Sequence, residues 1–171
     1  MRNRWSGGST CKIENLAYRK GQVQSAAISS YQMQPAKARH YSLLETFLQD
    51  PNTTRLRQVH NTSVHIAILV HRGKIISVAS NRVGSRSRGC GYSRYTIHAE
   101  RNCIKKLGDI TKVKDCDMYI MRIMENRMTG SAFFGNSKPC EQCTCALLKL
   151  QREKGLRNVF YTSNPETHCG C

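Results

Sequence analysis

The pattern of apolar and polar positions predicts four β-strands along the chain. The first run, VHIAILV, is nearly all apolar, which is typical of a strand buried on both faces of a sheet. Arg72 and Gly73 separate it from the second run and indicate an antiparallel hairpin. The predicted strands are Val64–Val70, Lys74–Ser80, Cys116–Met124 and Leu156–Ser163.

Apolar residues that recur every three to four positions predict three helices. Pro51 ends the first of them, because the residue before a proline is disfavoured in a helix. Gly108 follows the second, in the position after a helix end that glycine favours. Pro139 begins the third, as proline is well suited to a first helical position. The predicted helices cover residues 38–50, 99–107 and 139–154.

The predicted elements follow one another as helix, hairpin, helix, strand, helix and strand. Two strands joined by a helix normally lie parallel with a right-handed crossover, whereas a hairpin is antiparallel. We therefore predict an α/β fold, a three-layer α-β-α sandwich around a mixed sheet of about four strands. The catalytic domain is expected over residues 35–163, after a basic polar extension (1–34) that we expect to be flexible and before a cysteine-containing tail (164–171).

The charge of the chain favours partners that carry phosphate. Its 171 residues include 27 lysines and arginines against 11 acidic residues, a net charge of +16. Such a charge attracts mononucleotides, nucleic acids or anionic surfaces, although a solvated basic surface without a partner has the same composition. No apolar run is long enough to span a membrane, and the N-terminus lacks the apolar core of a secretory signal. We expect an intracellular protein, cytoplasmic or nuclear, that is neither secreted nor membrane-bound.

Nine cysteines in such a chain indicate reduced thiols or metal ligands rather than disulfides. Cys140 and Cys143 are two residues apart at a predicted helix start, where the helix dipole favours thiolate. His98 stands at the start of another predicted helix. Two sulfurs and one imidazole make three zinc ligands and leave a fourth position for water, which is the arrangement of a catalytic zinc site.

Glu100 lies on the same first turn as His98. A carboxylate there can exchange protons with a zinc-activated water, whose pKa is about 7, without being a ligand itself. The competing interpretation is a structural zinc site or plain buried cysteines, because C-x-x-C alone is common and H-x-E alone is a weak signal. Both motifs occur here, each at the start of a predicted helix, and the combination favours catalysis.

On these residues the sequence resembles the zinc-dependent cytidine and deoxycytidylate deaminase superfamily, whose pattern is H-x-E followed by P-C-x-x-C. The resemblance covers residues 36–163 and includes the order of elements. It implies a cytidine deaminase-type fold, zinc held by His98, Cys140 and Cys143, and hydrolytic deamination with Glu100 as proton carrier. Family members usually continue into a fifth strand, which we expect to be missing here. The sheet edge would then be covered by the N-terminal extension or a partner subunit, or left open.

The resemblance is closest to the deoxycytidylate-type members. The small free-cytidine deaminases usually carry cysteine in the place of His98. The segment ALLKLQREKGLRNVFYTS is most similar to cytidylate-type members, and NSKPC lacks the Trp-Ser that precedes Pro-Cys in polynucleotide cytosine editors. The same resemblance implies that Asn81 contacts the sugar and that the backbone around Ala99 lines the base pocket.

The loop RVGSRSRGCGYSRYT is expected to bind a substrate phosphate, because guanidinium groups match phosphate oxygens. Arg82 and Arg94, both within this loop, are the candidates. Tyr161 is a candidate for stacking on the base, as are Phe133 and Phe134. Each has a structural alternative: the arginines could be solubilising surface residues, the aromatic residues could belong to the core, and Asn81 could simply form a turn.

Three functions stay open. The first is a zinc-dependent deaminase that converts the cytosine base of a (deoxy)cytidine nucleotide or nucleoside to uracil with release of ammonia. The second is a deaminase acting on cytosine or adenine in RNA or single-stranded DNA, with the +16 charge holding the polymer. The third is a non-catalytic nucleic-acid-binding or assembly protein, which would not need Glu100. We favour the first, as a homo-oligomer that binds Zn²⁺ and a small cytosine nucleotide.

Overall fold

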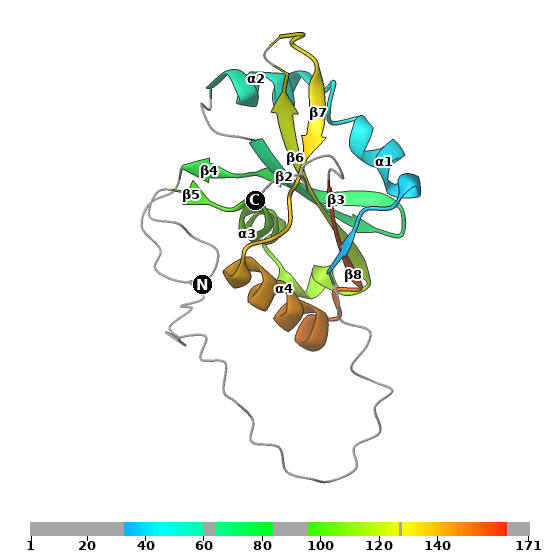
Figure 1. Ribbon diagram of the computed structural model, residues 1–171. Coiled ribbons are helices and arrows are strands. Elements are labelled where there is room, and N and C mark those ends of the chain that lie inside the picture. The colour runs from blue at the N-terminus through cyan, green and yellow to red at the C-terminus, as the bar shows by residue number, and fades with distance from the viewer. Residues whose placement is uncertain (1–32, 60–63, 84–95, 127, 164–171) are drawn as a thin grey trace.

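The computed structural model describes residues 33–59, 64–83, 96–126 and 128–163, which form one main mixed β-sheet between two layers of helices (Figure 1). The predicted three-layer α-β-α sandwich is therefore present. None of the described helices is long and apolar enough to cross a membrane. The predicted C-terminal tail and nearly all of the predicted N-terminal extension lie outside the described residues. One face is covered by α1 (Ala38–Glu45) and α2 (Pro51–Val59), the other by α3 (Ala99–Leu107) and α4 (Glu141–Lys154).

Five strands cross the sheet in the order β1-β8-β6-β2-β3. β2 and β3 form the predicted hairpin, and β6 is antiparallel to β2. β8 lies parallel to β6, as predicted for two strands joined by a helix, and β1 lies parallel to β8. These strands are β1 (Met33–Pro35), β2 (Val64–His71), β3 (Lys74–Ser80), β6 (Cys116–Glu125) and β8 (Asn158–Tyr161).

The edge position beyond β8 is occupied, although the sequence predicted that a fifth strand would be missing. β1 comes from the segment immediately before α1 and pairs with Val159, Phe160 and Tyr161. The ladder continues where the Ala36 N–H donates to the Tyr161 carbonyl at 2.7 Å. Three residues are too few to show a strand period, so only the pairing reveals this strand. Of the expected ways to cover the edge, the structure uses the N-terminal segment.

Two more elements lie where the sequence predicted none. β7 (Ala132–Gly135) pairs with the second half of β6, in a segment that was predicted to be an irregular connection. α2 begins at Pro51, which was predicted only as a helix stop. Asp50 makes this start possible, because its carboxylate accepts hydrogen bonds at 3.1 Å from both the backbone N–H and the hydroxyl of Thr53.

Alternate residues of β2 face opposite helix layers. Ile66 and Ile68 belong to the core cluster under α1 and α2, whereas Ala67 and Leu69 belong to the cluster under α3 and α4. All four side chains are buried, so the prediction of a strand buried on both faces is confirmed. His65 shares its strand face with Ala67 and therefore points to the side of α3 and α4.

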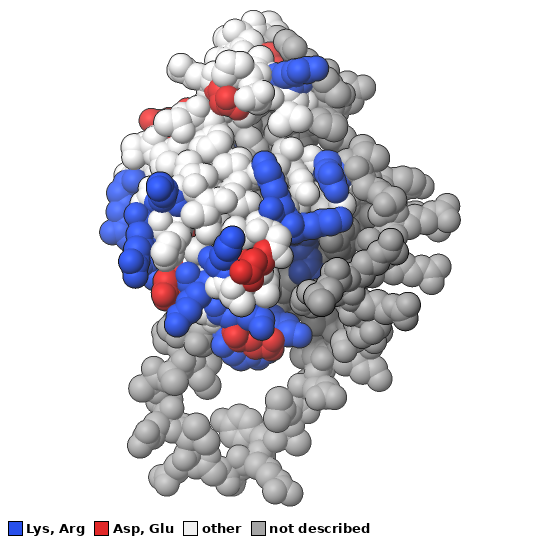
Figure 2. Space-filling view, turned by 180° about the vertical axis from the view of Figure 1, so that it is seen from behind, with Lys and Arg blue, Asp and Glu red and all other residues white. Residues whose placement is uncertain are grey.

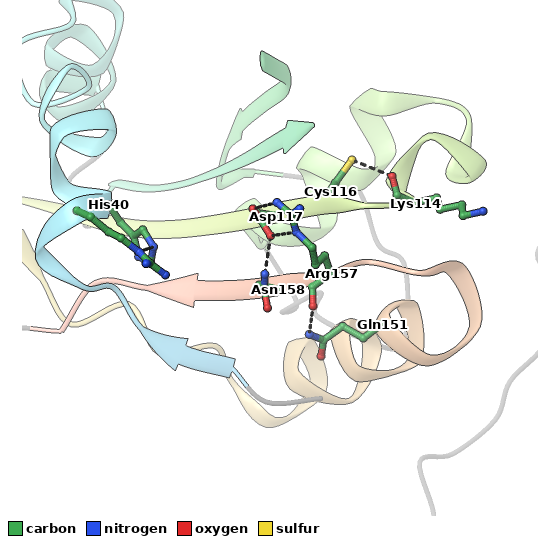
Figure 3. A network of polar contacts seen from close by, with 8 residues as sticks. His40, Lys114, Cys116, Asp117, Gln151, Arg157 and Asn158 are labelled. Atoms are coloured by element: carbon green, nitrogen blue, oxygen red, sulfur yellow. Dashed lines mark hydrogen bonds and ion pairs between the residues drawn. The ribbon is translucent and has the colours of Figure 1, made fainter. Parts of the chain in front are cut away.

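The carboxylate of Asp117, near the start of β6, links β6 to the start of β8 (Figure 3). Asp117 is buried and accepts hydrogen bonds from the Arg157 guanidinium and from Asn158 Nδ2, the latter at 2.8 Å. Gln151 of α4 donates to the Arg157 carbonyl at 3.4 Å. These contacts hold the end of α4 and the start of β8 in place relative to β6.

Candidate metal centre

The first turns of α3 and α4 converge, and each helix begins with a residue that can bind a metal. His98 is the N-cap of α3 and Cys140 is the N-cap of α4. Both have the extended backbone of an N-cap, but neither side chain makes a capping hydrogen bond to its own helix. The imidazole and the thiol are therefore available for another ligand.

Three donor atoms lie together at this point. Nδ1 of His98 is 3.6 Å from Sγ of Cys140 and 3.4 Å from Sγ of Cys143, and all three atoms lie within 4.8 Å of one another. Zinc bonds of about 2.3 Å to sulfur and about 2.0 Å to nitrogen, at a tetrahedral angle, place N and S about 3.5 Å apart. The observed separations match three corners of a tetrahedral zinc site.

The electrostatics of the site also favour a cation. Burial, and then the charges of Glu100 and Cys140, raise the pKa of the buried Cys143 thiol above its ordinary value. Glu100 itself is only 6% exposed, and its charge contributes to the raised pKa of this thiol. A metal ion reverses this balance, because a coordinated thiol loses its proton. The buried sulfur and the buried carboxylate are therefore compatible with a metal between them.

The family comparison agrees with this geometry. The family model described as the cytidine and deoxycytidylate deaminase zinc-binding region matches residues 45–161. The chain belongs to this deaminase family. The prediction of zinc as the cofactor is confirmed by the matched region together with the three donor atoms.

A comparison with curated proteins gives no match. Among solved structures, the crystal structure of dCMP deaminase from the cyanophage S-TIM5 in complex with dCMP and dUMP is similar, with 18% sequence identity and a TM-score of 0.41. The similarity covers 74% of this chain and 85% of that chain.

Two of the residues predicted to contact the substrate are Ala99, which follows the ligand His98, and Asn81, which bonds to His65 of β2. Ala99 is fully buried between His98 and Glu100 at the start of α3. Asn81 follows β3, where its Oδ1 accepts the His65 N–H at 2.9 Å and its own N–H donates to the His65 carbonyl at 3.0 Å. The carbonyl end of the Asn81 amide is thus held by the sheet.

A short ladder holds Arg82 beside the strand that leads into α3. β4 (Arg82–Val83) and β5 (Thr96–Ile97) pair so that Arg82 lies opposite Ile97, the residue before His98. The Arg82 side chain is exposed. Arg94 lies outside the described residues, so its predicted phosphate contact stays a prediction.

The predicted aromatic residues lie on two sides of the sheet. Tyr161 is half-buried against the core cluster that includes residues of α3 and α4, on the same side as the donor atoms. Phe134 packs on the opposite side, with its ring 5.5 Å from that of Tyr41, so it belongs to the core rather than the base pocket. Phe133, its neighbour on β7, faces the other way and is 37% exposed.

Sequence analysis missed two polar residues on the metal side of the sheet. His65 of β2 is paired with Arg122 of β6. Burial, followed by the charges of Arg122 and His98, lowers the pKa of His65 to about 4. A histidine within an otherwise apolar strand was the available signal, but strand pairing was needed to bring it to the site.

A buried cluster of hydroxyl groups supports the loop that carries Cys140. The Ser137 hydroxyl donates to the Ile120 carbonyl at 2.8 Å and accepts the Thr162 N–H at 2.9 Å. The Ser137 N–H donates to the Thr162 carbonyl, and the Thr162 hydroxyl donates to the Gly135 carbonyl at 2.7 Å. This network, two residues before the buried Pro139, fixes the entry into α4 and with it the position of Cys140.

Proposed function

We propose that this chain is a zinc-dependent hydrolase that deaminates the cytosine base of a (deoxy)cytidine nucleotide or nucleoside, and deoxycytidylate in particular. The observation that carries the proposal is the buried carboxylate of Glu100. It lies on the first turn of α3, two residues after the N-cap His98, and its charge contributes to the raised pKa of Cys143. A structural zinc site is closed by four protein ligands and needs no such carboxylate. Three donors with a buried acid beside them suit a site that activates water.

His98, Cys140 and Cys143 would hold the zinc ion in this reaction. When bound, zinc polarises a water molecule and lowers its pKa to about 7. Glu100 accepts the water's proton and delivers it to N3 of the cytosine ring while the water oxygen bonds to C4. Glu100 then carries the second proton to the 4-amino group, the C4–N bond breaks, and ammonia leaves. Cytosine and water thus give uracil and ammonia.

The substrate contacts are assigned to residues around this centre. Asn81 donates through its NH₂ group to a sugar hydroxyl, because its carbonyl oxygen is already bound by His65. Arg82 and Arg94 bind the phosphate, which the exposed position of Arg82 beside the residue before His98 supports. The Ala99 backbone lines the base pocket and Tyr161 contacts the base from its side of the sheet.

A second candidate function is deamination of cytosine or adenine within RNA or single-stranded DNA. The observation that favours it is the net charge of +16, because a polynucleotide is held largely through its phosphates. The two candidates are distinguished by offering the zinc-loaded protein dCMP, cytidine and single-stranded oligonucleotides and measuring ammonia release and base conversion. A protein that binds zinc but converts none of them would contradict both.

Replacement of Glu100 by glutamine tests the catalytic role directly. Glu100→Gln keeps the shape of the side chain but removes the proton carrier, so we expect dCMP turnover to fall by roughly 10²–10⁴-fold. Stoichiometric zinc should be retained, which elemental analysis of the purified variant would measure. The matched control is Glu141→Gln, which changes an exposed glutamate on the first turn of the other ligand-bearing helix.

A further inference from the structure

The two helices that begin at the metal centre also end together. α3 and α4 both contact η2 (Ile110–Val113), the short 3₁₀ helix that follows α3. The Asp115 N–H donates to the carbonyl of Gly155, which ends α4, at 2.9 Å. Because a helix advances about 1.5 Å per residue, the last turns of α3 and α4 lie roughly 12 Å and 20 Å from the ends that carry His98 and Cys140.

Exposed lysines gather where these helix ends meet. They come from the last turn of α3, from η2 and its following residue, and from the last residue of α4. Seen from behind, lysine and arginine side chains cluster over the lower part of the described surface, with a few acidic side chains among them, whereas its upper part is mostly uncharged (Figure 2). We define the basic face as Lys105, Lys106, Lys112, Lys114 and Lys154.

Most of these charges are not used inside the fold. Lys106 donates to the Val78 carbonyl at 3.0 Å, but among the described residues the structure gives none of the five lysines a salt bridge. The neighbouring arginines differ, because Arg152 lies 3.6 Å from Glu153 and Arg157 is bound to the buried Asp117. Among the described residues, the other four lysines of the basic face therefore expose ammonium groups that have no ion-pair partner.

The lysines also border a hollow. A depression of about 610 Å³ is lined by three of these lysines and one carboxylate, together with uncharged and apolar side chains: Lys106, Lys112, Lys114, Asp115, His71, Thr111, Ile76 and Leu107. Lysines in the last turn of a helix are expected in any case, since they balance the negative end of its dipole. Lys112 likewise lies in the last turn of η2, whereas Lys114 follows η2 and is not explained in this way.

We propose that the basic face binds the phosphate backbone of a nucleic acid, at a site separate from the deaminase centre. Its ammonium groups are spread over three elements rather than converging on one point, which suits successive phosphates of a chain better than a single anion. The face lies at the opposite ends of the helices that hold the metal ligands. It therefore tethers the protein to a polynucleotide without feeding that strand into the base pocket.

The test compares two variants that lose the same charge. Lys112→Gln/Lys114→Gln removes two lysines of the basic face, and Lys37→Gln/Arg55→Gln removes two exposed cations from the side of α1 and α2. Binding of labelled single-stranded RNA, single-stranded DNA and duplex DNA is measured by fluorescence anisotropy over a range of salt concentrations. Competing inorganic phosphate and vesicles containing phosphatidylserine test the other anions.

We expect Lys112→Gln/Lys114→Gln to bind nucleic acid several-fold more weakly than the wild type. Lys37→Gln/Arg55→Gln should bind as the wild type does. The negative slope of log K against log salt concentration should become shallower by about 1.4 on single strands, because each lost phosphate contact contributes about 0.7 to it. Turnover of dCMP should stay at the wild-type level in both variants, which also shows that they are folded. Equal loss in both variants, unchanged binding in the first, or a preference for the vesicles over every nucleic acid would overturn the proposal. Lys112→Gln alone repeats the test if the double variant does not fold.

Discussion

At the scale of single residues, the metal centre depends on two N-cap positions whose side chains do not cap. His98 and Cys140 leave the first backbone N–H groups of their helices without the usual side-chain partner. Their donors instead meet each other and Cys143 at 3.4–3.6 Å. Both helices thus lack the capping hydrogen bonds that would stabilise them, because these side chains form the ligand set instead. Such a departure from local stability is common at functional sites.

His65 makes the stability of the protein sensitive to acid. The folded protein holds the pKa of this half-buried histidine at about 4, whereas the unfolded chain takes up the proton near 6.5. Below pH 6.5 the unfolded state therefore binds more protons, and stability falls as the pH decreases toward 4. We expect this residue to lower the free energy of unfolding by about 3 kcal/mol over that window, as measured by urea unfolding at several pH values.

The variant His65→Gln isolates this effect, because every other acid-sensitive group is common to both proteins. Its free energy of unfolding should fall less steeply between pH 6.5 and 4 than that of the wild type. His71→Gln, at the other end of the same strand, serves as the control and should keep the wild-type slope. Parallel curves for wild type and His65→Gln would show that His65 is protonated freely in the folded state.

At the scale of elements, the segment between β7 and α4 determines where Cys140 lies. β7 and β8 pair with neighbouring halves of β6, and the Ser137 and Thr162 hydroxyls fill the junction between them. Both side chains are buried and satisfy backbone groups of three strands or loops. A buried network of this kind is rigid only while all its members are paired.

Removal of the Ser137 hydroxyl should therefore weaken both the fold and the metal centre. Ser137→Ala removes one partner each from the Thr162 N–H and the Ile120 carbonyl, which still bond to each other at 3.0 Å, and we expect a loss of about 0.5–1.5 kcal/mol in the free energy of unfolding. The zinc dissociation constant, measured by competition with a chelating dye, should rise as well. Ser131→Ala in the exposed turn before β7 should change both by little, and equal effects of the two variants would contradict a positioning role for Ser137.

Element prediction from the sequence succeeded where the local pattern was long. The apolar runs of β2 and β6 and the stripe of α3 span seven or more residues each, enough to show their period. β1 has three residues and β7 has four, so neither could be recognised without its partner strand. α2 was missed because Pro51 was interpreted as a stop, although Asp50 before it supplies the cap that makes proline a start.

At the scale of the whole molecule, zinc joins parts of the chain that are far apart in sequence. His98 and Cys140 are 42 residues apart, and β6 with its hairpin to β7 lies between them. A ligand that binds only the folded chain stabilises it by mass action. The metal should therefore contribute to the stability of the whole domain as well as to the reaction.

Removal of zinc should lower the melting temperature. At free zinc of about 100 times the dissociation constant, linkage gives about 2.7 kcal/mol, which corresponds to a shift of roughly 5–10 °C for a chain of this size. Differential scanning fluorimetry with a zinc series and with chelator would measure this shift. In the variant Cys143→Ser the dependence on zinc should be strongly reduced, and a wild-type melting temperature that ignores zinc would argue against a bound metal.

The sequence by itself determined the ligand types, the position of Glu100 two residues after His98 and the four predicted strands, because these depend on spacings of a few residues within one element. Only the tertiary structure decided that His98 and the cysteine pair meet, that β1 completes the sheet, and that His65 and Arg122 face the metal side. These relations depend on strand order and register, which join residues dozens of positions apart. Local periodicity carries no information about such long-range pairing.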